Sequence, residues 1–187
     1  MARPKKGEGG DARARLVEAA GRSFRVGGFG GTGVDGLAKE AGLTSGAFYA
    51  HFESKAEAFR VAVAEGLAVL RNGVHSFQER HGRNWREPFI DFYLGPRMEV
   101  GLDEACGLPS FASDVARADE TTRTQYEAEF QQLVDAVTAG LRGPHARQRA
   151  LALLAILSGA AAMARAVKDD RIRREILAAA NAAAKVI

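Results

Sequence analysis

The sequence predicts an all-α protein in two parts, a small N-terminal helix-turn-helix domain and a larger helical domain. Three observations support this fold class: apolar residues recur at helical spacing, short alternating runs rich in Val, Ile and Thr are missing, and glycine or proline interrupts the pattern at intervals that suit helix ends. We expect a flexible basic arm over residues 1–10, a helix-turn-helix domain over residues 11–53, and a helical effector-binding and dimerisation domain over residues 54–187.

Charge and cysteine content narrow the class of protein. The 187-residue chain has a net charge of +3, but residues 1–25 carry seven Lys or Arg against three acids, so residues 26–187 sum to −1. A basic head on a near-neutral body indicates that only the head meets a polyanion. The single cysteine, Cys106, excludes an intramolecular disulfide and fits a reducing cytoplasm. No apolar run reaches about 18 residues, so neither a membrane span nor a secretory signal is expected.

Three helices are expected in the head. The first is capped by Asp11 and ends at Gly27–Gly28. The second covers residues 34–41, and Gly42 makes the turn to a third helix, which Thr44 is placed to cap. Their predicted inward-facing residues are Leu16, Ala19, Ala20, Phe24, Val34, Leu37, Ala38, Ala41, Leu43, Ala47 and Phe48.

The body is also predicted to be helical. Ser54 and Glu57 form a capping pair at the start of a helix that extends to about Gly73. Further helices are expected over residues 73–81, 86–102, 109–118, 120–141, 145–167 and 171–186. The last two are rich in Ala, whose small side chain permits close packing, so they suggest a surface on which two subunits form a four-helix bundle. An ordinary buried helical hairpin is the alternative.

A dense motif lies at the end of the head. It reads Ala41-Gly42-Leu43-Thr44, then Gly46, Phe48-Tyr49, His51-Phe52 and Lys55. This order and spacing resemble the DNA-binding domain of TetR-family transcriptional regulators, and the resemblance runs from Ala14 to about Phe59. It implies a two-domain, all-α homodimer that binds a near-palindromic operator in double-stranded DNA, represses transcription, and is released by a small-molecule effector.

The resemblance also implies which residues touch DNA. The start of the third helix offers free N–H groups and a positive dipole end to phosphate, tyrosine and histidine can donate hydrogen bonds to it, and lysine adds a charge. Gly33 stands where members of the family often have Ser or Thr, which costs a helix cap or one phosphate contact. The residues expected to contact DNA are Thr32, Thr44, Ser45, Gly46, Tyr49, His51 and Lys55.

Enzymatic alternatives find little support in the residues. Gly31 to Gly36 formally match the G-x-G-x-x-G dinucleotide fingerprint, but that fingerprint needs a preceding buried strand, and residues 14–25 read as an amphipathic helix. The four histidines and Cys106 share no metal-ligand spacing. We therefore expect no catalytic residues, metal or cofactor. The remaining alternatives are an enzyme or ligand carrier on a helical bundle, and an activator or nucleoid-associated protein.

The central region is the expected effector site, because pockets for small ligands are mainly apolar with a few polar anchors. Arg97, Glu99 and Tyr126 are candidate anchors. Cys106 precedes a predicted helix, a position that can lower a thiol pKa, so a redox- or electrophile-sensing role is one hypothesis and a buried small hydrophobe is the other. The predicted effector-contacting residues are Trp85, Phe89, Phe92, Tyr93, Phe111, Tyr126 and Phe130.

Overall fold

A computed structural model describes residues 8–187, and no strand occurs within them, which confirms the all-α fold class. The expected arm over residues 1–10 falls largely outside the described residues. The helices are α1 (Glu8–Gly31), α2 (Val34–Glu40), α3 (Ser45–Tyr49), α4 (Lys55–His81), α5 (Arg86–Tyr93), α6 (Gly107–Ala116), α7 (Glu120–Ala139), α8 (Ala146–Ala166) and α9 (Asp170–Val186), with 3-10 turns η1 (Gly82–Asn84), η2 (Pro96–Met98) and η3 (Leu102–Glu104).

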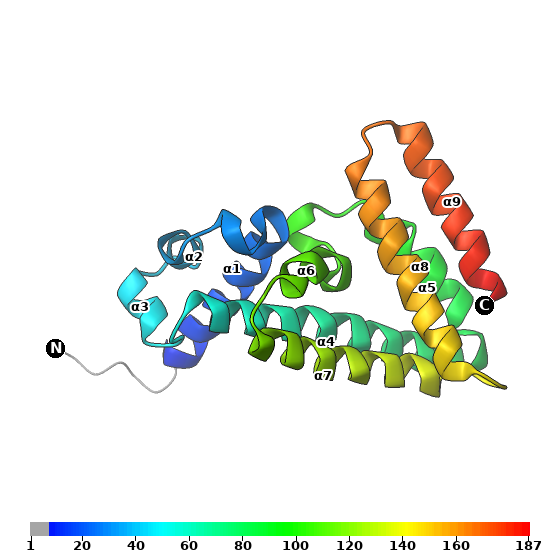
Figure 1. The fold of residues 1–187 in the computed structure, drawn as a ribbon, viewed down its shortest axis with the longest axis horizontal. Coiled ribbons are helices and arrows are strands. Elements are labelled where there is room, and N and C mark those ends of the chain that lie inside the picture. The colour runs from blue at the N-terminus through cyan, green and yellow to red at the C-terminus, as the bar shows by residue number, and fades with distance from the viewer. Residues whose placement is uncertain (1–7) are drawn as a thin grey trace.

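The helices form an elongated molecule with the head at one end (Figure 1). Helices α1, α2 and α3 gather at that end, and the long helix α4 runs from the head into the body with α7 alongside it. Helices α8 and α9 pair with each other at the opposite end. Helix α4 is therefore the longest helix that connects the head with the body.

The smaller of two hydrophobic cores holds the head together. Phe24 of α1 meets Phe59 of α4 edge to face, with 5.2 Å between ring centroids, and Phe59 meets Phe111 of α6 at 5.9 Å. Leu37 of α2 and Phe48 of α3 are fully buried in the same core. The head thus rests on the first half of α4 and on α6, so its core extends beyond the predicted boundary at residue 53.

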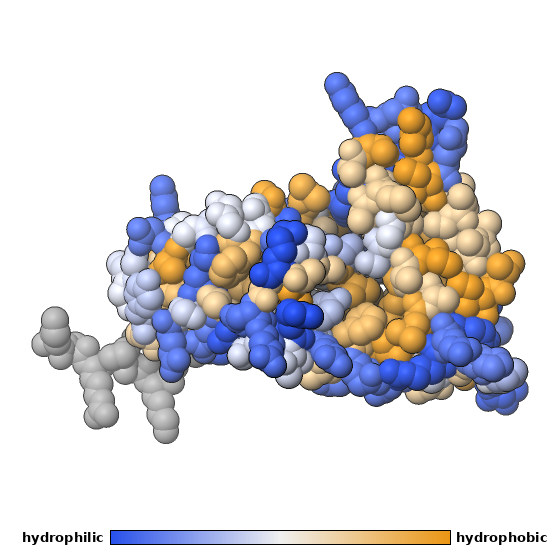
Figure 2. All heavy atoms as spheres, in the orientation of Figure 1, coloured by the Kyte–Doolittle hydropathy of each residue, from blue (hydrophilic) through white to orange (hydrophobic). Residues whose placement is uncertain are grey.

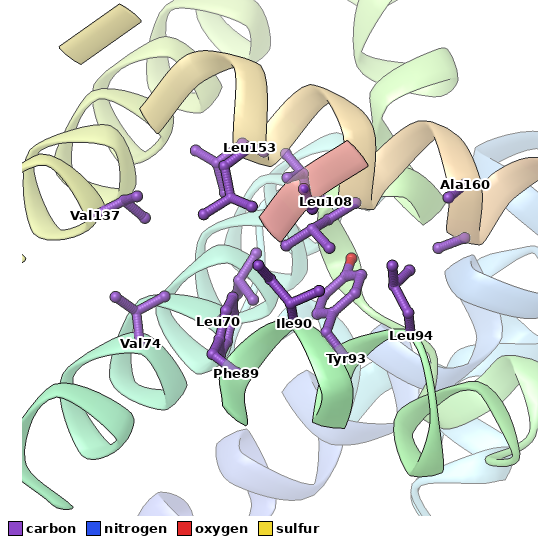
Figure 3. Close-up of a cluster of buried hydrophobic side chains, with 14 of the residues drawn as sticks. Leu70, Val74, Phe89, Ile90, Tyr93, Leu94, Leu108, Val137, Leu153 and Ala160 are labelled. Carbon is purple, nitrogen blue, oxygen red and sulfur yellow. The ribbon is translucent and has the colours of Figure 1, made fainter. Parts of the chain in front are cut away.

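The larger core fills the body. It joins α4, α5, α6, α7 and α8 through side chains that include Leu70, Phe89, Leu108, Val137 and Leu153 (Figure 3). Each of these five residues is nearly or fully buried. This core fixes the far half of α4 against its neighbours.

Two predicted helix ends in the body are wrong. Helix α4 continues without interruption through Gly73, because a glycine inside a helix costs only about 1 kcal/mol relative to alanine and packing offsets that cost. The expected helix over residues 86–102 ends at Tyr93, and two 3-10 turns follow Gly95. The predicted capping pair of α4 is confirmed in part: Ser54 Oγ accepts from the Glu57 N–H at 3.1 Å. The Glu57 carboxylate, however, accepts from the N–H of residue 53 rather than from that of the cap.

A kink in α1 ties the head to the body. The predicted stop at Gly27–Gly28 is instead a break inside α1, where Gly28 adopts φ 68° and ψ 179°. The next N–H, that of Phe29, donates to Asp114 Oδ2 of α6 at 2.8 Å. A Cβ at Gly28 would lie 2.9 Å from the same oxygen, so both the backbone angle and the close approach favour glycine here.

Candidate DNA interface and ligand cavity

The turn between α2 and α3 sets the angle of the helix-turn-helix. Gly42 has φ +67°, and its N–H donates to Lys39 O at 3.0 Å while the Leu43 N–H donates to Ala38 O at 2.8 Å. This pair of bonds closes α2 in a Schellman motif, which places its glycine in the left-handed region. The predicted turn at Gly42 is confirmed.

Helix α3 begins as predicted. Thr44 has extended backbone angles, and its Oγ1 accepts from the Ala47 N–H at 3.2 Å. Among the described residues no acceptor meets the N–H groups of Ser45 and Gly46, and Gly46 is exposed. Unpaired N–H groups at an exposed helix start suit an anion such as phosphate.

Tyr49 is the exposed aromatic of the head. Its side chain is 60% exposed, while Phe48 and Phe52 on either side are buried. Its ring lies edge-on to Phe48 at 5.5 Å between centroids. The phenol therefore stands on a rigid support and faces outward, whereas His51, in the turn after α3, is half-buried.

Besides Thr44, whose hydroxyl caps α3, two more of the seven predicted DNA contacts are already engaged within the protein. Ser45 Oγ hydrogen-bonds to Asp35 of α2. Lys55 Nζ donates to Phe29 O at 2.8 Å and to Thr32 O at 3.3 Å, and it lies 4.3 Å from the Phe29 ring centroid. Both interactions stabilise the junctions of the head, so the structure gives Ser45 and Lys55 bracing roles that the sequence did not indicate.

Thr32 and Gly33 lie in the loop before α2. Thr32 is half-buried, and its carbonyl is one of the two acceptors of Lys55. Gly33 caps α2 without a side-chain hydrogen bond, as expected from the missing hydroxyl. A helix, α1, precedes Gly31 to Gly36 instead of a strand, so the dinucleotide-binding alternative is wrong.

A cavity of about 270 Å³ opens between α4 and α5, beside the start of α6. A second cavity of about 150 Å³ adjoins it toward α8. Together they fall within the range of about 300–1,000 Å³ that is typical of ligand pockets. The residues that line both are Arg25, Tyr93, Arg97, Ala105 and Cys106.

Three of the seven predicted effector residues line the larger cavity: Phe89, Phe92 and Tyr93. Phe77 of α4 joins them, with ring centroids 5.5 Å from Phe89 and 5.4 Å from Phe92. The predicted anchor Arg97 also lines both cavities. Glu99 instead pairs with Arg173 at 3.1 Å.

The other four aromatic residues line neither cavity. Trp85 is buried in the body core, where Nε1 donates to Gly140 O at 2.9 Å. Phe111 packs in the head core. Tyr126 and Phe130 stack on each other on α7 at 5.9 Å and pack against both cores. We correct these four predictions: helical spacing alone does not tell a core aromatic from one that faces a cavity.

Sequence reasoning missed two arginines of the cavities, Arg25 and Arg165. Arg25 was counted only as part of the basic head. No acid lies three or four positions from Arg25 or Arg97, so neither has a helical ion-pair partner, and this absence is the signal that could have singled them out. Arg165 could not be singled out in this way, because an acid, Asp169, lies four residues after it.

Cys106 caps α6 at its N-terminal end, as predicted, but its thiol is not activated. Burial raises the pKa of the Cys106 thiol and outweighs the opposing effects of the Tyr93 hydroxyl, the Leu108 N–H and nearby arginines. The predicted lowering of this pKa is therefore wrong. Within residues 8–187 no group of three or more His, Cys, Asp or Glu could hold a metal ion.

Comparison with known proteins supports the interpretation of the head as a helix-turn-helix DNA-binding domain. The family model described as "Bacterial regulatory proteins, tetR family" matches residues 16–62. An uncharacterized HTH-type transcriptional regulator of Bacillus subtilis, YdgC, is 33% identical over 79 residues, which are 42% of this chain and 40% of that protein. The regulator TtgR of Pseudomonas putida is 44% identical over 57 residues, 30% of this chain and 27% of that protein. The matches thus span less than half of these curated relatives.

Solved structures match over nearly the whole chain. Reduced E. coli NemR has a TM-score of 0.79 at 20% identity, covering 95% of this chain and 96% of that one. A TetR-family regulator from Cytophaga hutchinsonii has a TM-score of 0.78 at 15% identity, covering 98% of both chains. At such identities the likeness concerns the fold.

The exposed start of α3, the turn at Gly42 and the helical body define a class, the helix-turn-helix transcriptional regulators with a separate helical domain. Within that class, residues 16–62 match the DNA-binding domain of the tetR family, and the whole chain has the fold of solved TetR-family regulators. Members of this family are in general not enzymes, and they regulate transcription by binding DNA.

Proposed function

We propose that the protein is a cytoplasmic, homodimeric repressor that binds a near-palindromic operator through α3 and leaves it when a small molecule occupies the body. The observation that carries the proposal is the exposed start of α3, with the Ser45 and Gly46 N–H groups unpaired and Tyr49 projecting from a buried aromatic base. A protein that used its head only for packing would not need an exposed phenol there.

The DNA contacts we propose follow from this geometry. The N–H groups at the start of α3 meet one phosphate, and the phenol of Tyr49 and the imidazole of His51 meet the backbone nearby. Thr44 fixes the helix start through its cap. Thr32 approaches the DNA backbone from the loop before α2. Lys55 adds positive charge near the surface while it braces the end of α1.

We propose that the dimer forms through α8 and α9. Large hydrophobic side chains are exposed along these two helices, and apolar residues gather over them (Figure 2). Helix α8 is also long and apolar enough to cross a membrane by length and composition, with a mean hydropathy of 1.4 over 18 residues, although only 39% of that window is buried within one subunit. A second subunit would cover this surface. The exposed large residues are Leu151, Met163, Ile172 and Val186.

Effector control would act through α4. Its first half, at Phe59, belongs to the head core, and its second half, at Leu70 and Phe77, lines the cavity. A ligand that moves the second half of α4 also moves the head. Release follows only if the ligand prefers the arrangement in which the two heads no longer fit successive major grooves.

Fluorescence anisotropy tests the regulator directly. The purified protein is titrated against DNA that flanks its own gene and against a scrambled duplex, across a salt series. We expect sequence-selective binding with a steep salt dependence. Equal, weak binding to both duplexes would favour the alternative of a ligand carrier whose head only packs.

Sedimentation velocity tests the dimer. We expect a dimer for the wild type and a monomer for Met163→Glu, which places a charge in the proposed interface. Val26→Glu is the matched control, because Val26 has a similar exposure, 59% against 55%, but lies on α1. A Met163→Glu variant that remains dimeric would place the interface elsewhere.

A sensing role for Cys106 stays a prediction. The thiol lines both cavities, so a bound electrophile would be close to it, but its raised pKa keeps it protonated at neutral pH. We expect Cys106→Ser to retain operator binding. Loss of the response to an electrophile in that variant would support sensing, and an unchanged response would remove the hypothesis.

A further inference from the structure

The two adjoining cavities differ in chemistry. The larger is lined by Val69, Leu70, Phe77, Phe89 and Phe92, which present an apolar and aromatic surface. The smaller is lined by three arginines: Arg25 from α1, Arg97 from η2 and Arg165 from α8. A ligand that spans both would have an apolar body and a polar end.

The three guanidinium groups lack acidic partners. In the part of the chain that the structure describes, no carboxylate lies within 4.0 Å of any of them, and neither cavity is lined by Asp or Glu. Arg97 donates to the Glu104 carbonyl, and Arg165 donates to the carbonyls of Val100 at 3.1 Å and Arg97 at 3.4 Å. Carbonyls satisfy donors but do not neutralise a charge.

Arg25 is the least satisfied of the three. Its guanidinium lies over the Phe111 ring, 5.1 Å from the centroid, and its buried Nε has no hydrogen-bond partner. Burial is the main cause that lowers the pKa of both Arg25 and Arg165. The charge of Arg97 lowers both further, with Arg173 adding to the effect on Arg165 and Cys106 opposing it at both. Asp103 exerts only a weak opposing effect on Arg25. Arginine stays protonated in proteins, so positive charges lie near one another here with no carboxylate within 4.0 Å of them in the described residues.

A second unpaired polar group faces the same space. The Tyr93 side chain is only 3% exposed and lines both cavities, and within the described residues its hydroxyl meets no nitrogen or oxygen partner, only the weakly accepting Cys106 thiol. Figure 3 shows its ring rising from α5 with the oxygen at the tip, directed away from that helix. A buried donor without a partner costs free energy that a bound acceptor would recover.

From these contacts we propose that the cavity binds an organic anion with an apolar or aromatic body, and that Arg25, Arg97 and Arg165 hold its carboxylate. The apolar body lies among Phe77, Phe89 and Phe92, and the Tyr93 hydroxyl donates to the anionic end. The anion site rests on the proposed function, because the bound anion is the proposed effector, now assigned to a chemical class. Planar carboxylates suit arginine because the guanidinium donates two parallel hydrogen bonds.

The position of Arg25 gives this anion a path to the DNA-binding head. Arg25 belongs to α1, whereas Arg97 and Arg165 belong to the body. A carboxylate shared among them would draw α1 toward η2 and α8 and replace mutual repulsion with attraction. The bound anion thus favours one arrangement of head and body, which is the condition for effector control.

Isothermal titration calorimetry on the full-length protein tests the proposal. The probes are benzoate, 2-naphthoate and decanoate, each paired with the neutral alcohol of the same skeleton. We expect at least one acid to bind at least tenfold more tightly than its alcohol. If no acid in the panel does so, the proposal is overturned.

Arginine variants test the site itself. We expect Arg25→Gln, Arg97→Gln and Arg165→Gln each to weaken binding of the best acid at least tenfold and to leave its alcohol within twofold. Arg83→Gln is the matched control, since Arg83 is exposed and lies outside both cavities, and its affinity for the acid should not change. Circular dichroism establishes that each variant is folded. Folded variants that all retain wild-type affinity would overturn the assignment.

Operator binding separates this proposal from the proposed function. The best acid should raise the operator Kd of the wild type, and this effect should be lost in Arg25→Gln. If the protein binds no operator but the calorimetry follows the expected pattern, the anion site stands and the repressor proposal fails. If it binds its operator but prefers alcohols to acids, the repressor proposal stands and the anion site fails.

Discussion

Replacing Tyr49 by phenylalanine removes one proposed phosphate contact and little else. The side chain is 60% exposed, and the hydroxyl makes no hydrogen bond within the described residues, so the free protein loses no interaction. The ring, which rests on Phe48, is retained. A hydrogen bond to a charged group contributes about 1.5–3 kcal/mol. In the proposed dimer two subunits contact each operator, so the lower value gives about 3 kcal/mol, or a loss of affinity on the order of 100-fold.

The assay is anisotropy with operator DNA at several salt concentrations. Because tyrosine is neutral, we expect Tyr49→Phe to weaken binding without changing the slope of log K against log salt, whereas the loss of a lysine contact would lower that slope. Tyr126→Phe is the matched control, since Tyr126 lies on α7 outside the head. An operator Kd for Tyr49→Phe within twofold of wild type would refute the phosphate contact.

Three further predictions concern stability and reactivity. Gly42→Ala forces alanine to φ +67°, which costs about 1–2 kcal/mol and lowers Tm by a few degrees in calorimetry, while Gly30→Ala, with negative φ and open space around it, should change Tm little. The Lys185 ammonium beside Asp91, with the Asn181 amide, lowers the pKa of that carboxyl, so the pair stabilises the fold at neutral pH and this effect declines as pH falls from about 4 through the lowered pKa. Asp91→Asn should therefore lower Tm more at pH 7 than at pH 3. Because burial raises the pKa of Cys106, alkylation by iodoacetamide should be slower than that of a free thiol at pH 7, and a faster rate would contradict the burial.

The head was largely predictable because local chemistry determines it. Thr44 as a cap and Gly42 as a left-handed turn act on their immediate neighbours, so their residue types carry the information. The kink at Gly28 and the partners of Lys55 were not predictable. They depend on Asp114, 86 residues after Gly28, and on where the end of α1 lies relative to α4.

The proposed effector site was predictable only in part for the same reason. Phe89, Phe92 and Tyr93 lie on one short helix and were identified together. The arginines come from α1, η2 and α8, which tertiary packing brings to one place, and no local pattern links them. Trp85 and Phe111 are recognisable in the sequence as large aromatic residues, but only their tertiary contacts show that they lie in the cores and not in the cavity.

The central claim is that two copies of α3 read a two-fold symmetric operator. The most direct measurement is selection of bound duplexes from a random DNA library by the full-length protein, followed by sequencing. The account predicts enrichment of a near-palindromic motif with half-sites about one helical turn apart, and loss of that enrichment in Tyr49→Ala. Selected sequences that show no motif beyond the starting library would contradict it.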